Sequence, residues 1–477
     1  MQELASMSAL ELVNNYKTKV ISPVEVINSV FSQIDSYQPT LNAFTFIDRD
    51  GALRDAKISE KRWLDNSSIG PLDGVPATIK DLIFVIGWPT RKGSRVTDPD
   101  ISAMEDAPAT ARLREAGCIL IGKTTTPEFG WKGVTDSSLS GTTLNPWNIK
   151  MTPGGSSGGA AVAAAVGMGA LHIGTDGGGS IRIPASFTGV FGFKPTYGLV
   201  PAWPASPFGS LAHVGPITKT VADAATMLTA ISNFDSRDWQ AQPYVDHDFF
   251  THLDHSIKDL RIAYSPNLGY AKVDLEVETI ISRQVQLFSE LGAVVELVDP
   301  GFHSPLEIFN MHWYAGAANL LQNFDSAEQE LIDPGLVEIA REGTDISLIQ
   351  YLASTNARNI LAETMNAFHQ KWDLLITPTL PTTAFPSNQA VPDPSTEKRW
   401  PDWTPFTYPF NLTQQPASSV PCGFTAAGLP VGLQIIGPKF SDKLVLRAAH
   451  AFESLCPFVM PDQDIVLSSS SIDRQNT

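Results

Sequence analysis

Residues 154–198 read GGSSGGAAVAAAVGMGALHIGTDGGGSIRIPASFTGVFGFKPTYG, and this stretch decides the fold. It holds 13 of the chain's 35 glycines within 45 residues. Glycine lets backbone approach backbone or ligand closely, and it adopts dihedral angles that other residues resist. The alanine run between the two glycine clusters predicts a helix packed very closely against its neighbours. A small-residue helix with a glycine turn at each end is the purely structural interpretation, and a reactive site is the functional one.

Three glycine motifs that carry chemistry can be tested against this stretch. A phosphate-binding loop needs GxxxxGK followed by Ser or Thr, and no lysine follows either glycine cluster. A dinucleotide fingerprint needs GxGxxG, but His172 stands where a third glycine should follow Gly167 and Gly169. Residues 154–158 satisfy GxSxG, the nucleophile elbow of α/β-hydrolases. The elbow requires a preceding strand and a downstream acid and histidine, and the polar stretch before residue 154 disfavours this alternative.

Further motifs lie on both sides of this centre. They are DGVPATIKDL (73–82), GKTTTPEFG (122–130), LNPWN (144–148), HVGPITKTVADAA (213–225), DLLITPTLP (373–381) and VPCGFTAAGLPVGLQIIG (420–437). Together with GGSSGG, GTDGGGSIRIP and FGFKPTYG of the centre, their order resembles the amidase signature family. The resemblance covers most of the chain and is weakest over residues 226–370. It implies an α/β fold with one central, mixed, twisted sheet covered by helices on both faces.

The resemblance also implies a catalytic triad of Ser180, Ser156 and Lys80. In this family the serine of the GGGS turn attacks the carbonyl carbon, and the serine after the glycine pair relays its proton to a neutral lysine. A serine hydroxyl is a poor nucleophile without such a base. At the usual lysine pKa of about 10.4, only about 0.0004 of the side chain is neutral at pH 7, so burial must lower the pKa of Lys80. A cis peptide between Gly155 and Ser156 is expected as well.

Other residues are expected to support this chemistry. Lys123 is the rival base, and the family pattern makes it structural. No metal or organic cofactor is needed for the mechanism. The expected oxyanion donors are the backbone N–H groups of Gly177, Gly178 and Gly179, and the expected supporting side chains are Ser157, Asp176 and Arg182.

The main alternative within the family is the A subunit of the glutamine-dependent tRNA amidotransferase. That subunit holds its charged glutamine with an arginine and an aspartate. Here NMHWYAGAANLLQNFD shows no such arginine, and Thr404 stands where the aspartate is expected. Trp313, Tyr314 and Phe406 instead predict an aromatic substrate pocket. We therefore expect an amidase that hydrolyses uncharged aryl or alkyl amides, by an acyl-enzyme route that also suits esters and carbamates. A catalytically silent structural subunit is the opposing class.

The composition argues against several kinds of partner. The chain has 33 basic and 50 acidic residues, and the net charge of −17 repels phosphate backbones and anionic lipid surfaces. Its three cysteines show no spacing typical of a zinc site or a disulfide scaffold. No apolar window reaches the roughly 18 residues of a membrane span. We expect a cytoplasmic monomer or homodimer that acts on a small-molecule substrate, without nucleic-acid or membrane partners.

Short apolar runs rich in β-formers alternate with helical patterns, which favours an α/β fold. Capping boxes at Ser8 with Glu11 and at Ser22 with Glu25 predict two helices over residues 8–37. The predicted strands are VPATI (75–79), CILIG (118–122), LRIAYS (260–265), AVVELV (293–298), DLLIT (373–377), SSVPCGF (418–424) and VGLQIIG (431–437).

We expect one amidase domain over residues 1–477. Its signature core is predicted to span about 65–225, followed by a more variable substrate-side region at 226–370. Residues 371–477 should supply the strands and helices that complete the sheet. Residues 224–259 are interpreted as an excursion, and residues 386–406 as a surface loop or lid.

Overall fold

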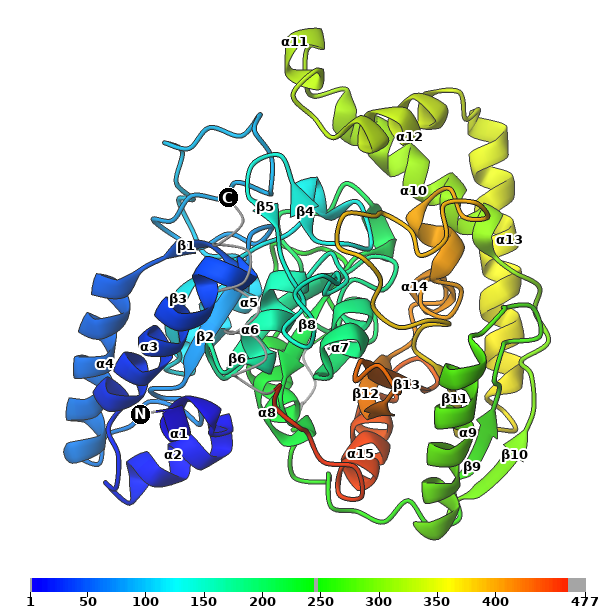
Figure 1. Cartoon of the computed structure of the whole chain (residues 1–477). Coiled ribbons are helices and arrows are strands. Elements are labelled where there is room, and N and C mark those ends of the chain that lie inside the picture. The colour runs from blue at the N-terminus through cyan, green and yellow to red at the C-terminus, as the bar shows by residue number, and fades with distance from the viewer. Residues whose placement is uncertain (1, 244–247, 462–477) are drawn as a thin grey trace.

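One large mixed sheet organises the molecule (Figure 1). The computed structural model describes residues 2–243 and 248–461. In spatial order the strands of the sheet are β1 (Phe44–Ile47), β3 (Ile119–Thr124), β2 (Pro76–Lys80), β6 (Leu171–Asp176), β8 (His213–Thr218), β7 (Phe191–Lys194), β12 (Ala417–Phe424), β13 (Pro430–Ile436), β11 (Leu374–Pro378), β9 (Arg261–Tyr264) and β10 (Val294–Leu297). A separate pair of short strands consists of β4 (Asp136–Ser137) and β5 (Gly141–Thr142).

Three neighbouring strands place the ends that matter for chemistry. β2 pairs in parallel with β3 on one side and with β6 on the other. The carboxyl ends of parallel strands meet at the same edge of a sheet. Lys80 at the end of β2 and Asp176 at the end of β6 therefore lie close together, although 96 residues separate them in the sequence.

Helices cover both faces of the sheet. The α-helices are α1 (Gln2–Ser6), α2 (Ala9–Lys17), α3 (Pro23–Leu41), α4 (Arg49–Leu64), α5 (Pro108–Glu115), α6 (Gly158–Ala165), α7 (Arg182–Thr188), α8 (Val221–Ile231), α9 (Leu275–Glu290), α10 (Leu306–Leu321), α11 (Ser326–Gln329), α12 (Pro334–Thr344), α13 (Leu348–Phe368), α14 (Pro409–Leu412) and α15 (Asp442–Glu453). Three short 3₁₀ helices are η1 (Glu128–Gly130), η2 (Gly209–Leu211) and η3 (Trp400–Trp403). None of the helices in the described residues is long and apolar enough to cross a membrane.

The local predictions for helices and strands are largely confirmed. Both capping boxes form, at the start of α2 and of α3. All seven predicted strands are present, and the alanine run forms α6, in which every residue is buried. The sequence patterns did not reveal β6, β7 and β8, because glycine and proline interrupt their apolar runs and their pairing is long-range.

Two expectations about loops need correction. The excursion predicted over residues 224–259 begins later, because its first residues belong to α8, which ends at Ile231. The stretch 386–406 is exposed at first, but Trp400, Trp403 and Phe406 are buried. Since these aromatic side chains pack into the interior, the second half of the stretch is part of the core and not a surface lid.

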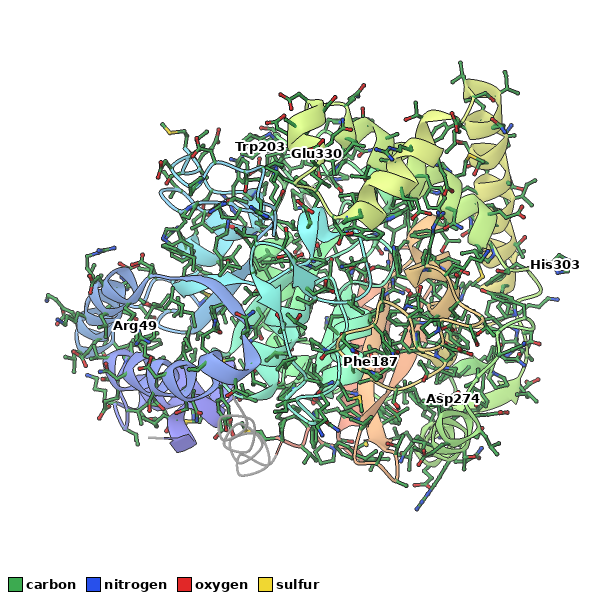
Figure 2. The ribbon with its side chains drawn as sticks, turned by 45° about the horizontal axis from the view of Figure 1, so that its top comes forward. Arg49, Phe187, Trp203, Asp274, His303 and Glu330 are labelled. Carbon is green, nitrogen blue, oxygen red and sulfur yellow. The ribbon has the colours of Figure 1, made fainter. Side chains whose placement is uncertain are left out.

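A second apolar cluster lies beside the sheet core and adjoins the glycine-rich turn after β6. It joins side chains of α7, α10 and α12 with the segment 385–412. Phe187 of α7 is fully buried and stacks on Trp403, with ring centroids 5.9 Å apart. In Figure 2, Phe187 lies within the body of the molecule, whereas Arg49, His303 and Glu330 lie toward its rim. This aromatic cluster gives the site one rigid wall.

Candidate active site

Lys80 is the centre of a hydroxyl cluster at the end of β2. Its side chain is fully buried, and all five residues of the strand are buried with it. The Nζ atom lies 2.6 Å from Ser156 Oγ, 2.9 Å from Ser157 Oγ and 2.9 Å from Thr175 Oγ1. The structure thus brings together the two residues, Lys80 and Ser156, that the resemblance assigns to proton transfer.

The surroundings of Lys80 favour its neutral form. Burial lowers the pKa of the Lys80 amine well below its usual value, and the negative charge of Asp176 opposes this only in part. No carboxylate of the described residues lies within ion-pair distance of Nζ, because Asp176 pairs with Arg182 instead. The Lys80 amine donates to the Ser157 and Thr175 hydroxyls, and when neutral it has one lone pair that can accept the proton of the Ser156 hydroxyl. Lys80 therefore has the properties of a general base.

Ser156 and Ser157 stand on a tight backbone turn before α6. A cis peptide joins Gly155 to Ser156, as the resemblance implies. A Cβ atom at Gly155 would lie 2.6 Å from the backbone of Val134, so only glycine fits there. Ser157 Oγ donates to the carbonyl of Thr175 at 3.0 Å, and the Ser157 N–H donates to the carbonyl of Ser180 at 3.1 Å. The two glycine-rich turns are therefore tied directly together.

Asp176 and Arg182 hold the turn that carries Ser180. Both side chains are fully buried and form a two-bond ion pair, with Nε–Oδ2 and Nη2–Oδ1 distances of 2.9 Å. Burial alone would raise the pKa of Asp176, but the adjacent Arg182 guanidinium outweighs it and keeps the pKa below its usual range. Arg182 also donates to Asn411, Gln434 and the carbonyl of Thr407. Such a bidentate, fully hydrogen-bonded pair gives the turn one geometry.

The amide groups of the GGGS turn divide into two kinds. The Gly179 N–H donates to Asp176 Oδ1 at 2.7 Å. Because the buried carboxylate already accepts this hydrogen bond, the Gly179 N–H does not face an oxyanion, and that expectation is corrected. The N–H groups of Gly177 and Gly178 meet no acceptor among the described residues, and Gly177 lines the cavity beside Ser180. A Cβ atom at Gly178 would lie 2.6 Å from the ring of Trp400, which explains the glycine. Gly177 and Gly178 stay the proposed donors.

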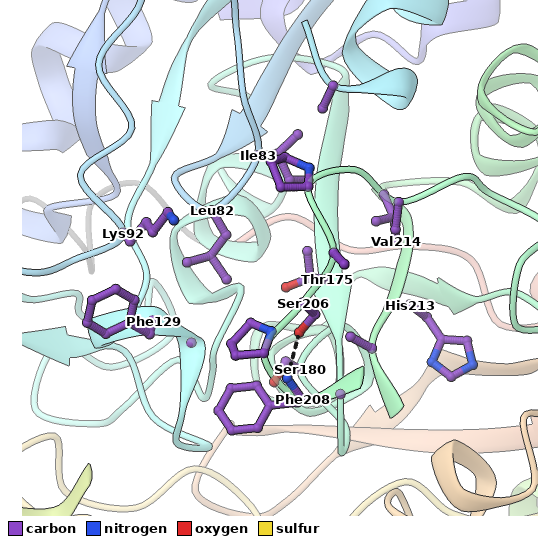
Figure 3. Close-up of a pocket in the computed structure, with 18 of the residues that line it drawn as sticks. Leu82, Ile83, Lys92, Phe129, Thr175, Ser180, Ser206, Phe208, His213 and Val214 are labelled. Atoms are coloured by element: carbon purple, nitrogen blue, oxygen red, sulfur yellow. Dashed lines mark hydrogen bonds between the residues drawn. The ribbon is translucent and has the colours of Figure 1, made fainter. Parts of the chain in front are cut away.

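Ser156 and Ser180 open into one cavity of about 150 Å³ (Figure 3). Trp313 lines it, as expected, and stacks on Phe208 with ring centroids 3.7 Å apart. Its wall is mostly apolar and includes Leu82, Ile83, Phe84, Phe129, Pro201, Trp203, Pro204, Pro207, Val214 and Leu320.

Two expected substrate contacts lie elsewhere. Tyr314 follows Trp313 on α10 and therefore faces another direction, since successive helical side chains are about 100° apart. Its hydroxyl accepts a bond from Arg399 at 2.7 Å. Phe406 is fully buried in a different apolar cluster, with Ala263 and Leu375. The assignment of Tyr314 and Phe406 to the substrate pocket is therefore corrected.

Lys123, the rival base, is also buried but has a carboxylate partner. Its Nζ lies 3.3 Å from Asp81 Oδ1 and donates to the carbonyl of Pro89 at 3.0 Å. Burial lowers its pKa to about 8, against the charge of Asp81. Because Lys123 does not line the cavity, its contacts support a structural role.

Two residues of the site, Thr175 and Asn411, were not predicted from the sequence. Thr175 binds Lys80, and its position in GTDGGGS, directly before Asp176, was the available signal. Asn411 donates to both the carbonyl and Oδ1 of Asp176 at 2.9 Å. No local sequence pattern indicates Asn411, because its partner lies 235 residues away.

Within the described residues, no group of three or more His, Cys, Asp or Glu side chains is arranged to hold a metal ion.

The α/β-hydrolase alternative fails on this geometry. The hydrogen-bond partner of Ser156 is Lys80 and not a histidine. A loop precedes Ser156, where the nucleophile elbow requires a strand. Comparison with known proteins agrees, since a family model described as Amidase matches residues 25–446. The chain belongs to the Amidase family.

Relatives of this amidase cover nearly its whole length. An acylamidase of Rhodococcus erythropolis is 38% identical over 96% of this chain and 97% of its own. The crystal structure of a bacterial aryl acylamidase of the amidase signature family superposes with a TM-score of 0.90 and 32% identity, covering 97% and 98% of the two chains. The A subunit of a glutamyl-tRNA(Gln) amidotransferase from Prochlorococcus marinus is 35% identical over 91% of this chain and 96% of its own. These relatives support the family fold over the entire sheet.

Proposed function

We propose that this amidase cleaves C–N bonds of uncharged amides through an acyl-enzyme on Ser180. The observation that carries the proposal is the contact of 2.6 Å between Lys80 Nζ and Ser156 Oγ in a cavity that Ser180 shares. Ser180 Oγ attacks the carbonyl carbon while its proton passes to Ser156 and the Ser156 proton passes to Lys80. The N–H groups of Gly177 and Gly178 receive the developing oxyanion.

The second half of the reaction reverses these transfers. As the C–N bond breaks, Ser156 donates a proton to the leaving nitrogen and recovers one from Lys80. Water then attacks the acyl-enzyme with the same residues acting as base, and the acid is released. Esters and carbamates suit the same route, because their leaving oxygen takes the same proton.

The cavity wall favours a small apolar acyl or aryl group. Its lining is dominated by leucine, proline, phenylalanine and tryptophan side chains. Such a wall stabilises aromatic or aliphatic groups by burial, whereas its described lining holds no carboxylate to pair with the ammonium of glutamine. The similarity to an acylamidase and to an aryl acylamidase supports this substrate class. The net charge of −17 also favours a small molecule over nucleic acid.

The second candidate is the glutaminase step of an amidotransferase, favoured by the 35% identity to the A subunit of such an enzyme. The purified chain should be incubated with acetanilide, phenyl acetate, a phenyl carbamate and glutamine, with Ser180→Ala as the control. We expect hydrolysis of acetanilide with kcat/KM well above that for glutamine. A preference for glutamine would reverse the choice, and no hydrolysis of any substrate would favour a silent structural protein.

A further inference from the structure

Lys92 lies in a cavity wall that is mostly apolar. Of the described residues that line the cavity with Ser156 and Ser180, Lys92 alone carries an ammonium or guanidinium group. Its side chain is half-buried and also borders an outer hollow, whose lining includes Phe84 and Trp203. The residue therefore stands at the junction between the reactive cavity and the molecular surface.

The ammonium of Lys92 is not neutralised by the protein. No hydrogen bond or ion pair joins Nζ to another residue of the described ranges, and the ring of Phe84 lies 5.8 Å from it. Burial lowers the pKa of Lys92, and the charge of Asp81 opposes this lowering, but Asp81 itself pairs with Lys123 at 3.3 Å. Two further carboxylates line the outer hollow, and neither forms an ion pair with Lys92: Glu105 pairs with Arg237 at 2.8 Å, and Asp98 accepts from the Asp100 N–H at 2.8 Å. Lys92 thus keeps donors for a ligand.

The backbone holds Lys92 in an unusual conformation. Its φ angle is +52°, in the left-handed region that disfavours residues other than glycine. The carbonyl of Lys92 accepts from the Phe129 N–H at 2.7 Å, and the Lys92 N–H donates to the carbonyl of Asp81 at 3.0 Å. These two backbone hydrogen bonds hold the Cα atom of Lys92, from which the side chain extends, at the cavity wall. In Figure 3 the amine points from that wall toward Leu82.

The position of Lys92 also identifies which half of the substrate it meets. In the mechanism above, Ser156 returns a proton to the leaving nitrogen, so the amine half must lie on the Ser156 side of Ser180. A Cβ atom at Gly130 would lie 2.8 Å from Leu82 and 3.2 Å from Ser156 Oγ, so these residues are contiguous. Phe129 precedes Gly130, and its backbone N–H donates a hydrogen bond to the carbonyl of Lys92. Figure 3 shows Leu82, Lys92 and Phe129 on one side of Ser180, and His213 and Val214 on the other.

We propose that Lys92 is a specificity-determining residue that binds a carboxylate at the far end of the leaving amine. The favoured substrates are then amides that release an aminobenzoate or a small amino acid, with the apolar acyl group on the opposite side. The inference rests on the proposed function, because it uses Ser156 to locate the leaving group. It extends the substrate class from uncharged amides to amides whose amine half is anionic.

The test compares pairs of substrates that differ in charge at this end. Wild type, Lys92→Met and Lys92→Glu would be assayed with 3- and 4-acetamidobenzoate and with their uncharged methyl esters, following release of the arylamine. Wild type should prefer at least one acid to its ester. The ratio of kcat/KM for acid over ester should fall about 10- to 100-fold in Lys92→Met, as expected for loss of one hydrogen-bonded ion pair, and further in Lys92→Glu. Lys57→Met, at an exposed lysine of α4, should keep the wild-type ratio.

A binding measurement keeps the inference separate from the proposed function. Calorimetric titration of Ser180→Ala with 3- and 4-aminobenzoate should show affinity that Ser180→Ala/Lys92→Met lacks, whether or not the wild type hydrolyses anilides. Equal affinity in both proteins, or an unchanged acid-to-ester ratio in Lys92→Met, would overturn the role of Lys92. Failure of wild type to hydrolyse acetanilide would instead count against the proposed function.

Discussion

Replacing Lys80 by methionine should change how the stability of the protein depends on pH. Burial lowers the pKa of Lys80 in the folded chain, whereas in the unfolded chain it returns to about 10.4. Between these two values the unfolded chain binds a proton on Lys80 that the folded chain does not. The free energy of unfolding therefore falls as the pH falls through this window. Lys80→Met removes that contribution while leaving every other titrating group in place.

The size of the effect follows from the linkage. A group protonated only in the unfolded state contributes about 1.36 kcal/mol per pH unit. From pH 9 to pH 7 the wild type should thus lose up to about 2.7 kcal/mol relative to Lys80→Met. The shifts of Lys123 and Lys194 are shared by both proteins and cancel in the difference. The same variant should lose activity about 100- to 10,000-fold, the usual contribution of a general base.

Urea unfolding at intervals between pH 7 and pH 9, followed by circular dichroism, measures this difference directly. Lys57→Met, at an exposed lysine, is the matched control and should run parallel to the wild type. The kcat/KM of the wild type should rise with pH as the free enzyme's Lys80 loses its proton, and Lys80→Arg should not restore it. Parallel stability curves for wild type and Lys80→Met would refute the claim that the fold holds this lysine neutral.

Other expected outcomes follow from the same site. Ser180→Ala should abolish turnover of acetanilide without altering the unfolding midpoint, and residual wild-type rates would exclude it as nucleophile. Asn411→Ala removes two bonds to Asp176 and should lower kcat about 10- to 1,000-fold with little change in KM, because the Gly177 N–H loses its fixed direction; a pure KM effect would argue against this. Lys123→Met leaves Asp81 buried without its partner, so it should cost about 3–5 kcal/mol in urea unfolding. Dialysis against a chelator should leave activity unchanged, and a loss restored by a divalent ion would contradict that.

Local signals made much of the fold predictable. Capping boxes operate within one helical turn, so Ser8 and Ser22 identified the starts of α2 and α3 without tertiary information. Short apolar runs likewise identified β2 and β3, because side chains buried on both faces leave a continuous pattern. The spacing of the glycine motifs indicated the family, and with it the proposed roles of three residues in the site.

The pocket was less predictable, because neighbouring residues in the sequence point in different directions. Trp313 and Tyr314 are equally aromatic, yet only the first lines the cavity. Phe406 carries the same apolar signal and lies in another cluster. Composition identifies an aromatic segment, but it does not show which of its side chains point into the cavity. That depends on how α10 packs against its neighbours.

The sequence by itself determined the glycine-rich turns, the strand that ends in Lys80 and the serines available to it, since these depend on local conformational preference and spacing. Only the tertiary structure decided that Gly179 donates to Asp176 and that Asn411 fixes the Asp176 carbonyl. It also placed Lys92 beside Phe129, on the wall shared with Ser156. The reason is physical: hydrogen bonds and burial depend on positions in space, and partners as much as 235 residues apart leave no periodic trace in the chain.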